Sequence, residues 1–383
     1  MILIENTTDL TNFCDVIRNE KFITIDLEFL REKTYWAQLC LIQVGSEKEC
    51  AIIDPLAEGI DLSPLYDILF DEKIIKVFHA ARQDLEIIYH LTGKIPSPIF
   101  DSQVAAMVCG FGESVSYQML AKKLSSQNID KSMRFSNWSK RPLDAEQLEY
   151  AISDVTHLIN IYKSLKKFLS DNKRTHWVDE EMELLTNPST YQFPPEDAWH
   201  RIKHRSTNRK FLTTLKELAF WREERAQKND ITRKMVIKDE CLLNIAAEMP
   251  KTHEDLAEIR GIRSDIVKGK LSDEILAIVE IASNIKAKDY VKLDKKDKIL
   301  GQGSSSLVDI LKLLLKIKSR ENDVAPKLIT NDHELRCIAS GDDTSALCLK
   351  GWRNEVFGKY AIALREGNLT FKFNPETKEI EFN

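Results

Sequence analysis

The sequence has little of what marks secreted, membrane-spanning or strongly basic proteins. Its seven cysteines are an odd number and contain no C-x-x-C pair, so we expect buried thiols in a reducing compartment and no disulfide framework. No apolar run approaches the roughly 20 residues of a membrane span, and the N-terminus lacks the features of a signal peptide. The net charge of −5 does not indicate a nucleic-acid-binding protein, although a local basic face would suffice. We therefore expect a cytoplasmic protein with no membrane partner.

The residues between Phe22 and Glu28 organise the rest of the chain. Their β-branched and apolar composition predicts a strand, and alternation of side chains places Asp26 and Glu28 on the same face. Acids are depleted in strands and an unpaired buried carboxylate is costly, so a divalent cation is one explanation. The alternative is a strand end that runs into solvent.

The first 180 residues alternate short apolar segments with amphipathic ones, which predicts a mixed sheet flanked by helices, a ribonuclease-H-like α/β domain. Gly93 is an expected helix C-cap, and Asp101 or Ser102 an expected N-cap. The expected strands are 22–28, 38–44, 49–54, 74–78 and 99–100, and the expected helices are 8–17, 62–70, 82–91, 102–109, 117–124 and 145–169.

Two further acids lie on predicted helices. Asp84 falls in the first turn of a predicted helix, where the helix dipole favours negative charge. The alternative for Asp84 is therefore an ordinary first-turn acid with no role in a site. Tyr150 and Asp154 are four residues apart and share one face of the long helix, on the side that carries its apolar residues. The alternative for Asp154 is an ordinary surface acid beside a buried tyrosine.

Four gathered carboxylates would not all ionise without cations, because their mutual repulsion raises the pKa values. Their oxygens suit Mg²⁺ or Mn²⁺. Two such ions could stabilise both the attacking and the leaving oxygen of a phosphoryl displacement. The candidate metal ligands are Asp26, Glu28, Asp84 and Asp154, with Tyr150 beside the attacking water.

Three segments, IDLEFLREKTYWAQLCLIQV, HAARQDLEII and EYAISDVTHL, stand in this order. Together they resemble the ribonuclease D family, in the tyrosine-bearing branch of the DEDD 3′-to-5′ exonucleases. The segments DSQVAAMVCG and KSMRFSNWSKRPL also resemble that family. The resemblance implies that the four acids bind two metal ions and that Tyr150 positions the water.

Further residues are candidates for substrate binding. Cations in the loop before the third segment would contact phosphates, and Trp138 would stack on a base unless it packs inward. Phe29 would stack on the terminal base or fill the core, and Gln38 would contact substrate only if its strand points towards the metals. The candidates are Phe29, Gln38, Lys131, Arg134, Trp138 and Arg141.

The C-terminal half contains an internal repeat, because residues 229–237 match residues 322–330 without gaps. Each copy follows an amphipathic segment, and both resemble the all-α HRDC domain, a nucleic-acid-binding fold; Lys350-Gly351-Trp352-Arg353 supports the second. A basic patch at 201–210 precedes the first copy. The expected division is an exonuclease domain at 1–180, linker 181–205, HRDC domain 206–286, linker 287–303, a second HRDC-like domain 304–370 and a tail 371–383.

The predicted function is a metal-dependent 3′-to-5′ exoribonuclease that trims precursor tRNA and other structured RNA to nucleoside 5′-monophosphates. The RNA preference and the tRNA substrate rest on the resemblance alone. No obligate protein partner is indicated, and a monomer is expected. A proofreading-type DNA exonuclease and a non-catalytic RNA-binding protein are the alternatives.

Overall fold

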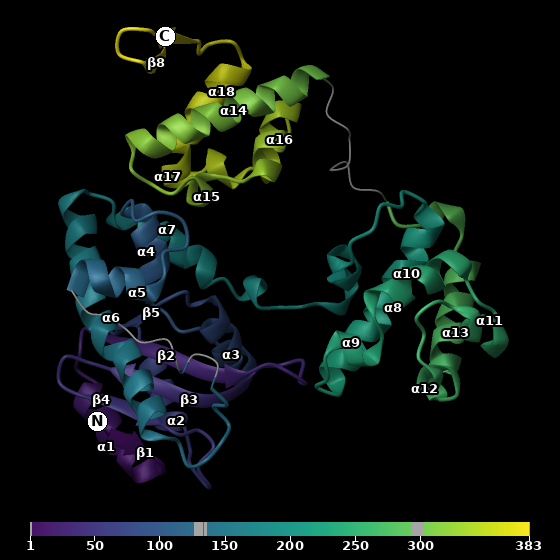
Figure 1. The fold of residues 1–383 in the computed structure, drawn as a ribbon, viewed down its shortest axis with the longest axis horizontal. Coiled ribbons are helices and arrows are strands. Elements are labelled where there is room, and N and C mark those ends of the chain that lie inside the picture. The colour runs from purple at the N-terminus through teal and green to yellow at the C-terminus, as the bar shows by residue number, and fades with distance from the viewer. Residues whose placement is uncertain (1, 126–132, 134–135, 293–301, 383) are drawn as a thin grey trace. The chain divides into compact units, whose positions relative to one another are not determined.

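The computed structural model describes residues 2–125, 133, 136–292 and 302–382, and these form two compact units (Figure 1). One unit comprises Met1–Glu28, Leu39–Thr190 and Ile299–Asn383. The other comprises Phe29–Gln38 and Tyr191–Lys298. A segment from the N-terminal region therefore folds with the middle of the chain, and the C-terminal residues fold with residues 1–28 and 39–190.

A six-stranded mixed sheet lies at the centre of the first unit, with the strand order β1-β4-β3-β2-β5-β6. Its β5 pairs in parallel with both β2 and β6, whereas β3 and β4 are antiparallel. The mixed sheet is confirmed, but β1, which pairs in parallel with β4, was not predicted. The strands are β1 Ile2–Ile4, β2 Phe22–Leu30, β3 Gln38–Gly45, β4 Cys50–Ile53, β5 Ile75–Phe78 and β6 Ile99–Asp101.

Helices flank this sheet, and most begin and end within two residues of the predicted positions (Figure 1). Gly93 ends α3 with a φ of 70°, a left-handed conformation that suits glycine. Asp101 is the N-cap of α4. The helices are α1 Thr7–Ile17, α2 Ser63–Leu69, α3 Arg82–Thr92, α4 Ser102–Val108, α5 Tyr117–Leu120, α6 Ala145–Asp171 and α7 Thr175–Leu185.

The middle of the chain forms a small helical module around its own apolar core, in which Leu215, Leu218, Leu242 and Ile245 are fully buried. We call it the first helical module. Its helices are α8 Arg209–Lys228, α9 Arg233–Val236, α10 Asp239–Glu248, α11 His253–Glu258, α12 Ser264–Val267 and α13 Lys270–Asn284.

The predicted repeat is visible in the structure. A second helical module begins with α14 (Gln302–Glu321), which has 20 residues like α8, and continues with a four-residue helix, α15 (Pro326–Ile329), like α9. The two aspartates that align in the repeat, Asp230 and Asp323, both have positive φ angles of 48° and 45°. The module continues with α16 Asp332–Ser340, α17 Gly351–Arg353 and α18 Lys359–Arg365.

The second helical module packs on α7. The rings of Trp177 and Trp352 stack with centroids 4.7 Å apart, and the Trp352 Nε1 donates to Glu181 at 2.8 Å. Arg353 forms an ion pair with the same carboxylate at 2.6 Å, and both side chains are 7% exposed. The segment 350–353, whose sequence resembles the HRDC domain, thus joins the second helical module to α7.

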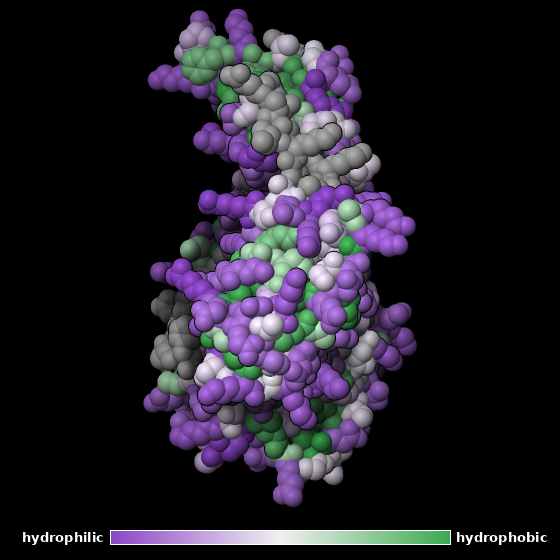
Figure 2. Space-filling model, turned by 90° about the vertical axis from the view of Figure 1, so that its right-hand side faces the viewer, coloured by the Kyte–Doolittle hydropathy of each residue, from purple (hydrophilic) through white to green (hydrophobic). Residues whose placement is uncertain are grey.

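The chain ends in a two-stranded hairpin of β7 (Phe371–Asn374) and β8 (Glu379–Phe382), within the segment 371–383 that was predicted as a C-terminal tail. Its register pairs Phe371 with Phe382. The described residues include no helix that is long and apolar enough to cross a bilayer. Hydrophilic side chains predominate on the face in Figure 2.

Candidate active site

The predicted strand brings two of the acids together. Ile23, Ile25 and Leu27 on one face of β2 are at most 5% exposed, which fixes the register of the strand and places Asp26 and Glu28 on the opposite face. Carboxylate oxygens of Asp26, Glu28 and Asp154 lie within 4.8 Å of one another. The structure thus gathers three of the four predicted ligands into a group of the size that a cation needs.

Helix α6 carries Asp154 to this position because it is fastened to the sheet. The Thr24 hydroxyl donates to the Val155 carbonyl at 2.8 Å, next in sequence to Asp154, and lies 3.3 Å from the Gly45 carbonyl. A Cβ at Gly45 would lie 2.5 Å from the Thr24 Oγ1, so only glycine permits this approach. The Tyr117 hydroxyl also donates to the Asp154 carbonyl.

Asp84 lies in the first turn of α3 and is 6% exposed. The turn before this helix is held by Asp101, whose carboxylate accepts from the Ala80 and Ala81 N–H groups at 3.1 and 2.8 Å. Burial, followed by the charges of Asp26 and Asp101, raises the pKa of Asp84 well above its ordinary value. The charge of Asp26 on β2 therefore contributes to the raised pKa of Asp84.

Without bound cations, the surroundings of these carboxylates favour their protonated forms. Burial raises the pKa of Asp26 to about 7. Burial and the Asp26 charge raise the pKa of Asp154 to about 8, against a hydrogen bond from Tyr150 that lowers it. Bound cations would reverse these shifts, since they favour the ionised carboxylates.

These shifts predict how stability depends on pH. Because the pKa of Asp26 is about 7 in the fold against an ordinary 3.8, the metal-free folded state binds the extra proton between these values. We expect the free energy of unfolding of metal-free protein to fall as the pH rises from about 4 to about 7. Asp26→Asn should weaken this fall, and Mg²⁺ should restore stability most above pH 7. Urea unfolding at several pH values measures the free energy of unfolding, and Asp171→Asn, at an exposed position, is the control. An equal dependence on pH in the wild type, Asp26→Asn and Asp171→Asn would contradict the prediction.

Two predicted substrate contacts are corrected by the structure. Trp138 is 2% exposed and its ring lies 6.0 Å from that of Tyr150, so it packs inward and offers no face to a base. Arg141 forms an ion pair with Asp54 at 2.5 Å and donates to the Cys40 carbonyl at 2.7 Å. Its guanidinium therefore fastens a loop to the sheet.

The other four predicted contacts have different outcomes. Lys131 and Arg134 fall outside the described residues. Phe29 is half-buried near the end of β2, and Gln38 is exposed at the start of β3. Both stay predictions.

Residues that support the site were missed by the sequence reasoning: Thr24, Gly45 and Tyr117 hold α6 in place, and Asp101 holds the turn before α3. The only signal for Asp101 was its expected role as an N-cap. The contacts of Thr24 and Tyr117 with α6 had no local signal.

Comparison with known proteins agrees with this architecture. Residues 1–170 match the family model described as 3′-5′ exonuclease, and residues 211–279 match that of the HRDC domain. The fold and these matches define the class of the protein as a 3′-5′ exonuclease with an HRDC domain.

Full-length relatives narrow the class. Ribonuclease D of Bartonella henselae is 43% identical over 97% of this chain and 91% of its own, and that of Nitrobacter hamburgensis is 42% identical over 96% of each. The crystal structure of Escherichia coli RNase D superposes with a TM-score of 0.85 at 27% identity, covering 95% of this chain and 98% of that one. The chain belongs to the ribonuclease D family and is a 3′-5′ exoribonuclease.

Proposed function

We propose that this exoribonuclease trims the 3′ ends of precursor tRNA and other structured RNAs, releasing nucleoside 5′-monophosphates. The observation that carries the catalytic part is the group formed by Asp26, Glu28 and Asp154, whose carboxylate oxygens lie within 4.8 Å of one another. The E. coli relative is described as an exoribonuclease involved in structured RNA processing, which supports the choice of substrate.

The exonuclease family is metal-dependent, and the acid cluster fits hard divalent cations because all its ligand atoms are carboxylate oxygens. We propose that Asp26, Glu28, Asp84 and Asp154 hold two ions, Mg²⁺ or Mn²⁺. When bound, the ions supply a water of lowered pKa and stabilise the charge of the departing 3′ oxygen.

The chain's own groups orient the reactants. Tyr150 donates a hydrogen bond to the Asp154 carboxylate, so its hydroxyl stands beside the metal-binding group and can hold the attacking water by its remaining lone pair. The centre of the Trp138 ring lies 6.0 Å from that of the Tyr150 ring. Tyr150 is therefore proposed to position the water.

RNA is proposed to contact the basic patch at residues 201–210, which precedes the first helical module. Lys203, Arg205 and Lys210 have exposed side chains, and such cations bind phosphates with a strong dependence on salt. The second helical module buries Trp352 and Arg353 against α7, so this segment is proposed to serve the fold. We further propose that the protein acts as a monomer in the cytoplasm.

A substrate panel tests the proposal. Purified protein is given end-labelled precursor tRNA with a 3′ extension, single-stranded RNA and single-stranded DNA, in EDTA, Mg²⁺ or Mn²⁺. We expect no turnover in EDTA, shortening of the tRNA extension one nucleotide at a time with either ion, and slower attack on DNA. Turnover in EDTA would refute the metal role, and equal rates on RNA and DNA would refute the substrate preference.

A further inference from the structure

The loop between β2 and β3 is held by the first helical module. Residues Phe29–Gln38 belong to the same compact unit as Tyr191–Lys298. The Asp230 Oδ1 accepts hydrogen bonds from the backbone N–H groups of Tyr35 and Trp36, at 3.0 and 2.9 Å. Because these contacts are to the backbone, they fix the path of the loop and not merely one side chain.

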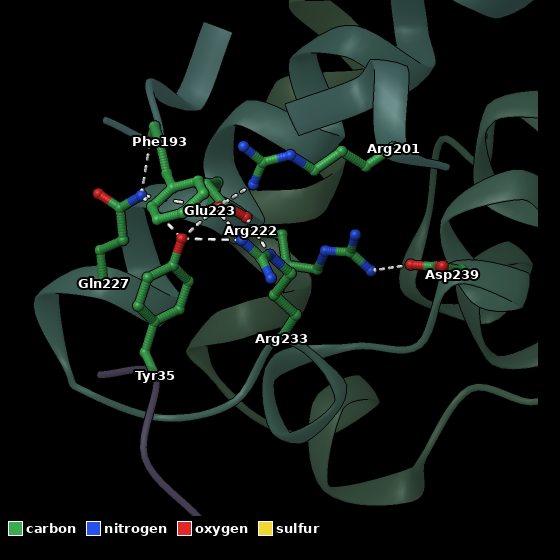
Figure 3. Close-up of polar contacts among 8 residues, drawn as sticks. All are labelled: Tyr35, Phe193, Arg201, Arg222, Glu223, Gln227, Arg233 and Asp239. Atoms are coloured by element: carbon green, nitrogen blue, oxygen red, sulfur yellow. Dashed lines mark hydrogen bonds and ion pairs between the residues drawn. The ribbon is translucent and has the colours of Figure 1, made fainter. Parts of the chain in front are cut away.

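A second contact anchors the loop through a buried carboxylate (Figure 3). The Tyr35 hydroxyl donates to Glu223 at 2.5 Å, and Glu223 is 1% exposed. Arg233 donates to both carboxylate oxygens of Glu223 at 2.5 Å, and its guanidinium lies 4.8 Å from the centre of the Tyr35 ring. Gln227 donates to the Tyr35 hydroxyl oxygen at 3.2 Å.

The protonation states suit a permanent anchor. Burial and the hydrogen bond to Glu223 raise the pKa of Tyr35 to about 12, so the hydroxyl keeps its proton at neutral pH. Although burial alone would raise the pKa of Glu223, hydrogen bonds from Arg233 and Tyr35 hold it below its ordinary value. The carboxylate therefore stays ionised, and its hydrogen bonds are of the strong, charge-assisted kind.

This loop is the direct continuation of the strand that carries two of the acids. Glu28 lies on β2, which ends at Leu30, and Tyr35 is reached after four more residues; β3 begins at Gln38, shortly after Trp36. A shift of the loop would be transmitted along the backbone to the Glu28 carboxylate. Displacement of a reacting group by about 1 Å can reduce a rate by about 10²-fold.

We propose that the first helical module holds the β2–β3 loop so that Asp26 and Glu28 keep their catalytic geometry, with Tyr35, Glu223 and Asp230 as positioning residues. This role adds to RNA binding and rests on the proposed function of the two acids. The positioning role requires that the first helical module affect the rate of hydrolysis even for a substrate that is too small to contact the module.

A minimal substrate separates positioning from gripping. The probe is the p-nitrophenyl ester of a nucleoside 5′-monophosphate, which offers one phosphodiester and no RNA chain. For full-length Tyr35→Phe and Glu223→Gln we expect kcat to fall by about 10- to 100-fold with little change in KM, and the Mn²⁺ concentration for half-maximal activity to rise. The matched control is Glu224→Gln, an exposed neighbour on α8, which should keep wild-type values.

Two outcomes overturn different statements. If Asp26→Asn retains activity on the ester, the metal site is wrong and the positioning proposal falls with it. If Asp26→Asn is inactive but Tyr35→Phe keeps the wild-type kcat and Mn²⁺ dependence, only the positioning role is refuted. Tyr35→Phe removes a single oxygen and keeps the ring on Arg233, so it decides the matter should Glu223→Gln not fold.

Discussion

Replacing Asp26 or Asp154 with asparagine is expected to lower the rate of nucleotide release from RNA by at least about 10²- to 10³-fold, the range seen when one electrostatic group is removed from a reaction centre. Each change takes a negative oxygen from a group that we propose to bind metal and whose carboxylate oxygens lie within 4.8 Å of one another. The fold should persist, because the amide has nearly the same shape and carries no charge, and burial of the charge is the first cause that raises the pKa values of both acids.

Release of 5′-mononucleotides from end-labelled RNA measures the rate, and calorimetric titration with Mn²⁺ measures ion binding. Asp171→Asn is the control, since it lies at the exposed end of the same helix as Asp154. Variants that lose activity and keep Mn²⁺ binding with wild-type affinity would show that these carboxylates are not ligands.

Removing Arg353 is expected to have the largest effect on stability. Arg353→Met leaves the carboxylate of Glu181, at 7% exposure, with Trp352 as a hydrogen-bond partner but without its counter-charge. Breaking one side of a buried ion pair typically costs about 3–5 kcal/mol, and the pKa of Glu181 is already raised, first of all by burial. Urea unfolding of the full chain, followed by tryptophan fluorescence, should report the loss because Trp177 and Trp352 stack at this junction.

A matched surface pair provides the control. Arg336 and Asp332 are paired at 2.7 Å with both side chains more than half exposed, so Arg336→Met should cost no more than about 0.5 kcal/mol. The double variant Glu181→Leu with Arg353→Met should recover much of the lost stability, since it removes both buried charges. A loss for Arg353→Met no larger than that for Arg336→Met would mean that the second module does not depend on this ion pair.

The elements that could be predicted from the sequence are those with local signals. Alternation in residues 22–28 predicted β2 and the shared face of Asp26 and Glu28, and the spacing of Tyr150 and Asp154 predicted a helix that carries both. The repeat was predicted because residues 229–237 align with residues 322–330 without gaps, and the two segments share the left-handed turn at Asp230 and Asp323.

What could not be predicted depends on partners far away in the chain. Arg141 was expected near phosphates, but its partner Asp54 is 87 residues away, and no pattern around either residue announces the pair. β1 has three residues and exists because it pairs with β4. The attachment of the second module to α7 joins residues 171–172 positions apart, a separation over which sequence patterns carry no information.

The Thr24 hydroxyl lies between α6 and Gly45 at the end of β3, and only glycine fits at position 45. This contact has a consequence for ion selectivity. Since strand, helix and hydroxyl are locked by folding, the spacing of the carboxylates is set before any ion arrives. A rigid group of carboxylates discriminates between ions by their radius, because Mg²⁺ binds oxygens at about 2.0–2.1 Å, whereas Ca²⁺ requires about 2.3–2.6 Å. We therefore expect Ca²⁺ to bind this site more weakly than Mg²⁺ and not to support turnover.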